Sequence, residues 1–338
     1  MNVSRETFDA DRRAWRKNSS LLAYATLLPY RQQEGDSKVA NNPDLPPVCD
    51  YEGSDYHSRF WESGERAYED RVERVAMRRL MPPQGDTLIE VGAGFGRLAD
   101  EYRGYKRVVL FDYSRTLLRE AQEALGEDPR FIYVAGNWYR MPFVSGLFET
   151  VVQIRTLHHA ADVAAVFEQL ARIARPQAAY VLEFASKKNL KAILRYAAGK
   201  QTWSPFSPEP VEFVELNYDF HPRWIREQLE HAGFDPQQML TVSHFRVPLI
   251  KKLVPTAALV ALDSGVQFTG NWWQLSPSVF VLNRNLGKQE IAGEELFFAC
   301  PECGTPLGEP QDGALVCSGC SRRWPVVDGL YDFKEPLS

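Results

Sequence analysis

The chain has 338 residues, of which 44% are hydrophobic and 25% are charged, a composition typical of soluble globular proteins. Its formal net charge of −5 argues against a protein wrapped in nucleic acid. The sequence contains no apolar run of about 18 residues, and its charged N-terminus lacks the apolar core of a signal peptide. We therefore expect a cytoplasmic protein with no membrane partner.

The first 50 residues are expected to form a helix followed by a mobile arm. Residues 4–30 have helical composition, and residues 31–47 are polar and contain proline and asparagine. A helical pattern returns from Tyr56 and ends at Leu80, shortly before two prolines. We interpret residues 51–84 as a helical cap, whose aromatic residues are Tyr51, Tyr56, Phe60 and Trp61.

Short apolar strands alternate with helical stretches over the remainder of a domain predicted at 51–286. Five expected strands are TLIEV (87–91), RVVLF (107–111), FIYVA (131–135), ETVVQI (149–154) and AYVLEF (179–184). Expected helices span 118–125, 163–174 and Pro222–His231, and two further strands span Met239–Val247 and Ser278–Asn283. Strand–helix alternation with nearly continuous apolar strands predicts an α/β fold with a doubly wound, mostly parallel, seven-stranded sheet.

A glycine-rich loop, Glu90-Val91-Gly92-Ala93-Gly94-Phe95-Gly96-Arg97, ends the first strand. Glycines at this position let the backbone turn sharply and approach a ligand closely. A dinucleotide fingerprint would require a third glycine at position 97, where this chain has Arg97. The carboxylate of Glu90 would repel a pyrophosphate but suits a ligand that carries an ammonium or a sulfonium group.

A second acid ends the next strand, where Asp112 follows Gly94 by 18 residues. A carboxylate at such a strand end can accept hydrogen bonds from both hydroxyls of a ribose. The alternative is that Asp112 only stabilises the start of the following helix and that the glycines only form a turn.

These motifs, in this order, resemble those of class I S-adenosylmethionine-dependent methyltransferases of the type 11-like group. The resemblance implies that Glu90, Gly92, Ala93, Gly94 and Gly96 surround the amino-acid end of S-adenosylmethionine and that Asp112 holds its ribose. It further implies that Tyr113 packs on the adenine. The segment Ala135-Gly136-Asn137-Trp138 resembles the one that contacts the adenine amino group, with Asn137 in place of the usual aspartate.

The fourth strand and the residues after it resemble the F-D-x-V…L-H-H segment of the same family, with Glu149 in place of aspartate. His158 and His159 follow this strand at the carboxyl edge, where ligands bind in this fold. One of them is a candidate catalytic base or substrate contact, or the pair only orients the loop. Arg155 is either a contact to a cofactor or substrate carboxylate or a solvated surface residue.

Two insertions, near 187–221 and 248–277, are rich in aromatic residues and form either a substrate lid or small hydrophobic subcores. The first begins with basic residues that no acid interrupts, namely Lys187, Lys188, Lys191, Arg195 and Lys200. Such a run indicates a solvated helix face, and it is also the best local candidate for contact with a phosphate-bearing substrate.

Four cysteines, Cys300, Cys303, Cys317 and Cys320, form two C-x-x-C pairs near the end of the chain. This spacing predicts a tetrahedral zinc site in which all four positions are filled, so that the metal is structural. The segment 287–338 resembles the small zinc-ribbon activator subunits of tRNA, rRNA and release-factor methyltransferases. From residue 300 on it holds three basic and six acidic residues, which disfavours direct RNA binding by the ribbon.

The sequence thus predicts an S-adenosylmethionine-dependent methyltransferase with a structural zinc ribbon that braces the catalytic domain. We expect a small-molecule methyl acceptor, although the ribbon resemblance also fits an exposed group of RNA or protein. The alternative is a non-catalytic, cofactor-binding scaffold that uses the ribbon as a protein-interaction module.

Overall fold

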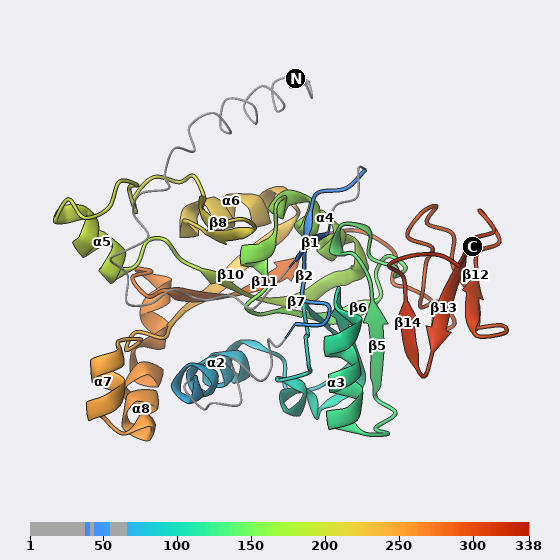
Figure 1. Ribbon diagram of the computed structural model, residues 1–338, viewed down its shortest axis with the longest axis horizontal. Helices are drawn as coiled ribbons and strands as arrows, with labels where there is room; N and C mark the ends of the chain where they lie inside the picture. The colour runs from blue at the N-terminus through green and yellow to red at the C-terminus, as the bar shows by residue number, and fades with distance from the viewer. Residues whose placement is uncertain (1–37, 41–43, 55–65, 338) are drawn as a thin grey trace, which may run out of the picture. The chain divides into compact units, whose positions relative to one another are not determined.

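The computed structural model describes residues 38–40, 44–54 and 66–337 (Figure 1). The helix expected over residues 4–30 and the cap residues Tyr56, Phe60 and Trp61 lie outside the described residues. The first two described strands, β1 (Lys38–Ala40) and β2 (Val48–Asp50), pair with each other in an antiparallel ribbon. None of the helices in the described part of the chain is long and apolar enough to cross a membrane.

A ten-stranded sheet dominates the structure, in the order β10-β11-β7-β6-β3-β4-β5-β14-β13-β12. The strands of the predicted catalytic domain are β3 (Gly85–Val91), β4 (Tyr105–Asp112), β5 (Phe131–Ala135), β6 (Phe148–Gln153), β7 (Ala174–Ala185), β10 (Phe234–Val242) and β11 (Ser278–Asn285). Five of these, from β7 to β5, run parallel, whereas β11 pairs antiparallel with both β7 and β10. The expected doubly wound, seven-stranded sheet is therefore confirmed.

Helices cover both faces of the sheet because alternate side chains of each buried strand point to opposite sides. In β3, Leu88 belongs to one core cluster and Ile89 to another. The cluster with Leu88 contains side chains of α2 (Ala67–Leu80), α3 (Arg115–Leu125) and α8 (Thr256–Val266). The cluster with Ile89 contains side chains of α4 (Val163–Ile173) and α6 (Pro222–His231).

Helix starts follow from local capping residues, as the sequence implied. The side chains of Ser114, Asp162 and His221 accept hydrogen bonds from the first turns of α3, α4 and α6. The predicted strand 239–247 is displaced: β10 begins at Phe234 and ends at Val242, since the next residue, Ser243, adopts a positive φ of 67°.

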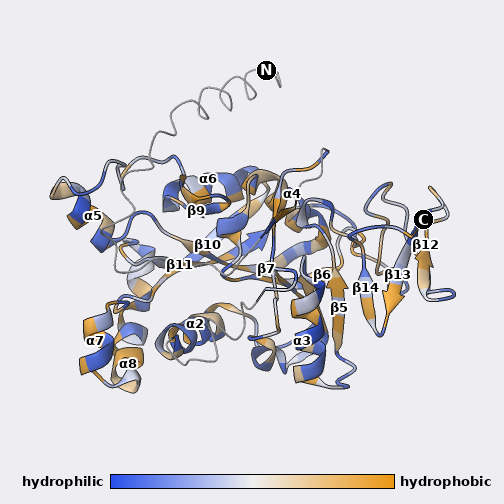
Figure 2. Cartoon of the chain, viewed as in Figure 1, coloured by the Kyte–Doolittle hydropathy of each residue, from blue (hydrophilic) through white to orange (hydrophobic). Residues whose placement is uncertain are grey.

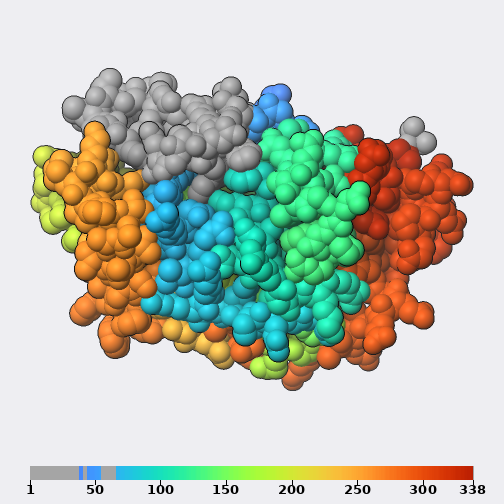
Figure 3. Space-filling model, turned by 90° about the horizontal axis from the view of Figure 1, so that it is seen from below, coloured from blue at the N-terminus to red at the C-terminus, as the bar shows by residue number. Residues whose placement is uncertain are grey.

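The two insertions contain short elements of their own. The first holds α5 (Leu190–Ala197), β8 (Val211–Val214) and β9 (Asn217–Asp219), and the second holds α7 (Pro248–Leu253), α8 and the 3₁₀ helix η5 (Gln267–Asn271). Helix α8 packs on α2 and on β10, and Figure 3 shows α2 (blue) beside the orange α7–α8 segment. The expectation of a solvated basic face fails at Lys187, which is fully buried and donates a hydrogen bond to the Glu209 carbonyl (2.6 Å).

The ribbon segment extends the same sheet. Its strands are β12 (Ala314–Val316), β13 (Arg323–Val327) and β14 (Leu330–Asp332). Strand β14 pairs in parallel with β5, which is hydrophobic along its length (Figure 2), and the ribbon belongs to the same compact unit as the sheet. Strand β5 would otherwise be an edge strand with unpaired backbone groups, so the ribbon satisfies that edge.

Aromatic packing reinforces this junction. Phe298, from the start of the ribbon, stacks on Phe143 with ring centroids 5.8 Å apart, and it also contacts Tyr331 and Phe333. Trp324 is buried against Phe333. The ribbon and the sheet therefore share one hydrophobic core.

Candidate functional site

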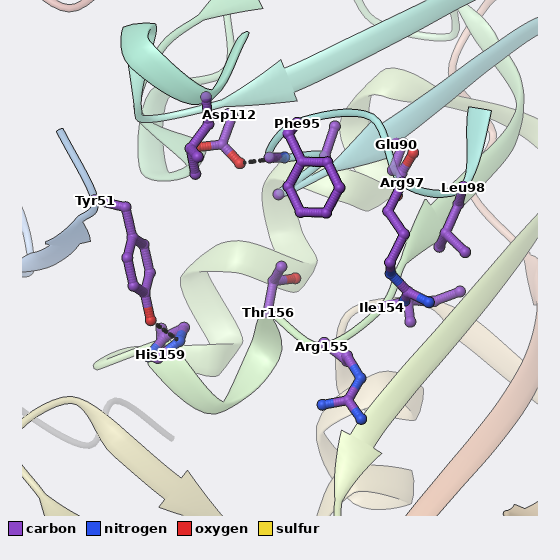
Figure 4. A pocket seen from close by; sticks show the side chains of 14 residues that line it. Tyr51, Glu90, Phe95, Arg97, Leu98, Asp112, Ile154, Arg155, Thr156 and His159 are labelled. Carbon is purple, nitrogen blue, oxygen red and sulfur yellow. Dashed lines mark hydrogen bonds between the residues drawn. The ribbon is translucent and has the colours of Figure 1, made fainter. Parts of the chain in front are cut away.

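Two adjoining pockets lie at the carboxyl ends of β3, β4 and β6. They share Tyr51, Gly92, Asp112, Thr156 and His159. The first pocket extends to Glu90, Arg97 and Arg155 (Figure 4), and the second to Tyr113, Gly136 and Trp138. Residues that the sequence places at the ends of separate strands are thus brought to one continuous site.

The glycine loop lies where the two pockets adjoin, since Gly92 lines both of them. Gly92 has a φ of 75°, and a Cβ placed on it would lie only 2.1 Å from Thr156 Cγ2. The amides of Gly92 and Ala93 both donate to the carbonyl of Phe111 at the end of β4 (2.8 and 3.1 Å). Only glycine meets both the conformational and the steric requirement at position 92.

Substitution of Gly92 should therefore weaken ligand binding at this site. We expect Gly92→Ala to lower the affinity for S-adenosylhomocysteine by about tenfold, since a positive φ and the contact with Thr156 both oppose a side chain. Gly94→Ala is the matched control, because its φ is also positive (54°) but the nearest atom to an added Cβ is 3.8 Å away. Titration calorimetry on both variants would measure the difference, and equal losses would contradict the steric argument.

No α-helix starts at the end of the glycine loop. The chain continues through turns into the short 3₁₀ helix η2 (Ala99–Tyr102). Arg97, at the position of the missing third glycine, forms ion pairs with Asp70 and Glu73 of α2. Because the loop offers neither an α-helix N-terminus nor an uncommitted cation at this point, it lacks the usual anchors of a pyrophosphate.

Glu90 is a buried acid that faces the first pocket. Its side chain is almost fully buried, and its Oε2 atom has no hydrogen-bond partner within the ranges that the structure describes. Burial raises the pKa of Glu90 to about 8, although the Tyr102 hydroxyl and the nearby Arg97 both act in the opposite direction. An unpaired buried carboxyl is costly, and a cationic ligand in the pocket would stabilise its charged form.

A ligand that carries an ammonium group should therefore release a proton from Glu90. The pKa of the free protein is raised, so Glu90 is protonated at pH 7, and binding of a cation favours the carboxylate. We expect the affinity for S-adenosylhomocysteine to rise by up to about tenfold per pH unit from about pH 6 to pH 8 and then to level off. Calorimetry in two buffers of different ionisation enthalpy would detect the proton, and Glu90→Gln should abolish its release. The same pH dependence in Glu90→Gln would contradict this assignment.

Asp112 lines both pockets and also braces the loop around them. Its Oδ2 accepts a hydrogen bond from the Gly94 amide (2.8 Å; Figure 4), and its Oδ1 accepts one from the Ser114 amide (2.8 Å). Burial raises the pKa of Asp112, although these two amides and Lys334 oppose the shift. The carboxylate is thus held in one orientation with lone pairs left for a ligand.

The second pocket contains the two aromatic residues predicted near an adenine. Tyr113 is half-buried and Trp138 is buried, and both line the pocket. Asn137 does not line either pocket, because its Oδ1 caps the 3₁₀ helix η3 (Trp138–Arg140) by accepting a hydrogen bond from the Tyr139 amide (2.9 Å). The structure therefore places Asn137 beside the pocket, in a local capping role.

Lys334, from the C-terminal segment, is a residue of this site that sequence reasoning missed. Its Nζ lies 4.0 Å from the centre of the Tyr113 ring and forms an ion pair with Asp50 (3.5 Å). The side chain is nearly buried, at 6% exposure. No motif signals this contact, since it depends on the docking of β14 beside β5.

The two histidines occupy different environments in the 3₁₀ helix η4 (Leu157–His159). The Nε2 atom of His159 lies 3.0 Å from the Tyr51 hydroxyl (Figure 4), and its Nδ1 atom lies 2.9 Å from the Leu216 carbonyl. A carbonyl only accepts, so Nδ1 carries the proton and Nε2 accepts from Tyr51 in the neutral ring. His158 is half-buried, and burial together with His159 and Arg155 holds its pKa well below the usual value.

Arg155 is part of a buried ionic cluster and not a solvated surface residue. Its Nε donates to Glu73 of α2 (2.8 Å), and its amide donates to Glu183 at the end of β7 (2.9 Å). The backbone of Arg155 adopts a φ of 60°, which is unusual for a residue other than glycine. This conformation directs Arg155 toward the first pocket, of which it forms a part.

A further acid, Asp219, lies on the same side as His158 and was also missed. Strand β9, which ends in Asp219, packs against η4, and Phe220 forms a parallel bridge with Ser186 at the end of β7. Burial raises the pKa of Asp219 to about 6, while Arg246 opposes the shift. The sequence could not reveal this residue, because it lies in an insertion with no motif of its own.

The four cysteines of the ribbon converge on one point. Their sulfur atoms all lie within 4.8 Å of one another, with Cys300 Sγ 3.6 Å from Cys320 Sγ and Cys303 Sγ 3.4 Å from Cys317 Sγ. None of them forms a disulfide. Four thiols in this arrangement fit a tetrahedral metal site without an open position.

Comparison with known proteins identifies both parts of the chain. Residues 89–182 match the family model of a methyltransferase domain, and residues 297–329 match that of Trm112p-like protein. The chain thus contains one segment that matches a methyltransferase domain and, after it, one that matches Trm112p-like protein, so both resemblances drawn from the motifs are confirmed.

Three relatives illustrate the range of similar proteins. They are an O-methyltransferase of Pyrenophora dematioidea (23% identity, 40% of this chain and 54% of the relative), an rRNA methyltransferase of Streptomyces thermotolerans (30%, 46% and 51%) and a demethylmenaquinone methyltransferase of Roseiflexus sp. (27%, 32% and 45%). The chain thus spans about half the length of these curated relatives.

Two solved structures are similar over a larger share of the chain. One is an S-adenosylmethionine-dependent methyltransferase from Mesorhizobium loti, with 20% identity, a TM-score of 0.47 and coverage of 64% of this chain and 100% of that chain. The other comes from a complex of the Haloferax volcanii Trm112 methyltransferase activator, with 14% identity, a TM-score of 0.46 and coverage of 67% and 93%.

Proposed function

We propose that the protein is an S-adenosylmethionine-dependent methyltransferase. The observation that carries the proposal is the pair of acids, the buried Glu90 and the partly buried Asp112, that line the pockets beside the glycine loop. Glu90 lines the first pocket and has a carboxyl oxygen, Oε2, that is buried without a hydrogen-bond partner, and Asp112 lines both pockets from the end of the next strand. In a ligand that carries both a cationic amino-acid end and a ribose, the amino-acid end would lie near Glu90 and the ribose near Asp112.

The other residues of the two pockets complete this assignment. Glu90, Gly92, Ala93, Gly94 and Gly96 would surround the amino-acid end, with Arg155 facing its carboxylate. Tyr113 and Trp138 would contact the adenine, and Asn137 would approach it through its Nδ2, since its Oδ1 serves as a cap. The bound cofactor supplies an activated methyl group.

His158 and Asp219 line neither of the two pockets, but they lie near them and are the titratable groups that could serve the methyl acceptor. His158 is neutral at pH 7 because its pKa is lowered, so it can accept a proton from an acceptor hydroxyl or amine. His159 is held between Tyr51 and Leu216, so it positions the tyrosine hydroxyl at the pocket. Direct positioning of the acceptor supplies much of the rate in an in-line displacement.

We propose a small molecule as the methyl acceptor. The ion-paired, partly enclosed setting of Arg155, Glu73 and Glu183 next to the pocket suits recognition of polar groups on a compact ligand. The Trm112p-like segment and the rRNA methyltransferase among the relatives favour RNA or protein instead. The acidic balance of the ribbon, with three basic and six acidic residues, speaks against RNA contact at that end.

We also propose that Cys300, Cys303, Cys317 and Cys320 bind one structural zinc ion. The convergence of four free sulfur atoms supports this site. With four protein ligands the ion would have no position left for substrate, so it would contribute to folding and not to chemistry.

Calorimetry with S-adenosylhomocysteine and with NAD⁺ tests the function. We expect S-adenosylhomocysteine to bind and NAD⁺ to show no heat of binding, since the loop lacks a pyrophosphate anchor. Binding of NAD⁺ alone would overturn the assignment. Transfer of a labelled methyl group to a panel of hydroxyl- and amine-bearing small molecules and to RNA would then distinguish between the acceptor classes. A protein that binds the cofactor but transfers to none of them would fit the scaffold alternative.

A further inference from the structure

Two segments of this acidic chain are strongly basic. Residues 185–208 contain five basic residues and no acid, and residues 244–277 contain three basic residues and one acid, whereas the whole chain has a net charge of −5. These segments hold α5 in the first insertion and α7, α8 and η5 in the second. The net charge of both segments is therefore opposite in sign to that of the whole chain.

The same segments expose large apolar side chains. Trp272 is 73% exposed, Trp273 57% and Leu253 74%, and Leu190, Leu194 and Leu249 are each more than half exposed. We call these six residues, together with the exposed Lys191, Lys200 and Lys252, the apolar-basic face. A soluble monomer rarely exposes several large apolar residues at one end of its fold unless they bind something.

Helix α8 is firmly attached to the fold, so its exposed apolar residues do not result from a loosely packed helix. It buries its one acid, Asp263, which accepts a hydrogen bond from the Tyr68 hydroxyl of α2 (2.6 Å). Leu262 and Val266, by contrast, are exposed. The helix is thus anchored through Asp263 and the buried Leu259, and it still leaves apolar residues exposed on its outer side.

The two insertions meet in the fold. The amide of Leu190, at the start of α5, donates to the carbonyl of Leu275, which follows Trp272 and Trp273 (2.8 Å). In Figure 1, α5, α7 and α8 all lie on the left, at the end of the sheet opposite the ribbon, and Figure 2 shows hydrophobic and hydrophilic residues mixed along them. The apolar and basic residues of both insertions therefore belong to elements at the same end of the sheet.

We propose that the apolar-basic face docks on the surface of a lipid bilayer that contains anionic headgroups. Exposed leucines would enter the boundary between headgroups and acyl chains, and tryptophan is the side chain enriched at that depth. The lysines would be attracted to anionic lipid. This surface contact is independent of the proposed activity. It revises our expectation of no membrane partner, which considered only spanning segments.

Other occupants of the face fit its chemistry less well. In a symmetric contact between two copies of this chain, the same surface meets itself, so the lysines of one copy would oppose those of the other. RNA would pair with the lysines, but it offers no apolar surface for Leu249 and Leu253. An anionic bilayer satisfies both the charge and the apolar residues.

Co-sedimentation of the full chain with vesicles tests the proposal. We expect binding to vesicles of equimolar phosphatidylglycerol and phosphatidylcholine, weaker binding at high salt, and little binding to phosphatidylcholine alone. Trp272→Ser/Trp273→Ser should lower the partition coefficient by about tenfold or more. Lys191→Glu/Lys200→Glu/Lys252→Glu should lower it by about 100-fold.

Matched variants elsewhere on the surface keep the test specific. Ile291→Ser/Leu296→Ser removes two exposed apolar side chains, and Arg103→Glu/Lys106→Glu/Lys288→Glu makes the same change in net charge. Both should leave vesicle binding unchanged. The proposal is overturned if the full chain does not bind anionic vesicles or if the control variants lose binding equally. It is also overturned if light scattering finds a dimer that only the tryptophan variant dissociates.

Discussion

Asp112→Ala should lower the affinity for S-adenosylhomocysteine by about 100-fold. The carboxylate of Asp112 lines both pockets, and hydrogen bonds from a ligand hydroxyl to a charged acceptor contribute about 1.5–3 kcal/mol each. Its loss also removes the acceptor of the Gly94 and Ser114 amides, so the loop loses a brace at the same time. Titration calorimetry would measure the affinity, and a thermal melt would measure how much stability the protein loses with the hydrogen bonds to the two amides.

Two variants separate the roles of Asp112. Ser114→Ala removes the side-chain cap of α3 and should lower stability by about 1 kcal/mol without a large change in affinity. Asp112→Asn keeps one acceptor for the loop amides but removes the charge and sets an NH2 group against the other amide, so it should melt between the wild type and Asp112→Ala and still bind weakly. If Asp112→Ala and Ser114→Ala lose stability equally and neither loses affinity, then Asp112 is only an acid at the start of a helix.

The sequence was informative wherever a residue's role is set by its neighbours in the chain. The spacing of apolar residues located the seven strands of the catalytic sheet, and α6 begins and ends where its proline and apolar pattern predicted. Glu90 and Asp112 were found because they end adjacent parallel strands, and adjacent strand ends must lie close together. Fold and strand-end acids are therefore predictable from local pattern.

Long-range contacts were beyond this reasoning. Lys334 reaches Tyr113 only because β14 pairs with β5, and no residue near Lys334 signals that pairing. The sequence fits a surface position for Arg155 equally well, since only the fold brings Glu73 and Glu183 next to it. The predicted role of Asn137 did not take account of the Tyr139 amide. This amide donates a hydrogen bond to the Asn137 Oδ1 atom, which therefore caps a 3₁₀ helix.

Cys317→Ser should abolish zinc binding and destabilise the whole described fold, not the ribbon alone. Metal binding contributes about 10 kcal/mol or more to the folding of small four-ligand zinc domains, and a segment this short has little core of its own. Its β14 satisfies the edge of β5, and Trp324 and Phe298 are part of the core of the sheet. We therefore expect the melting temperature to fall by about 5 °C or more.

The same change should weaken cofactor binding, because Lys334 and Phe333 lie against Tyr113 and Gly136 of the second pocket. Val316→Ser is the matched control, since it replaces the adjacent, exposed residue and leaves the four sulfur atoms in place. It should keep one zinc ion per chain by elemental analysis and melt near the wild type. Freshly purified protein without zinc would refute the metal site. Full stability after deletion of the residues beyond Gly293 would refute the bracing role and leave the ribbon as a recognition module.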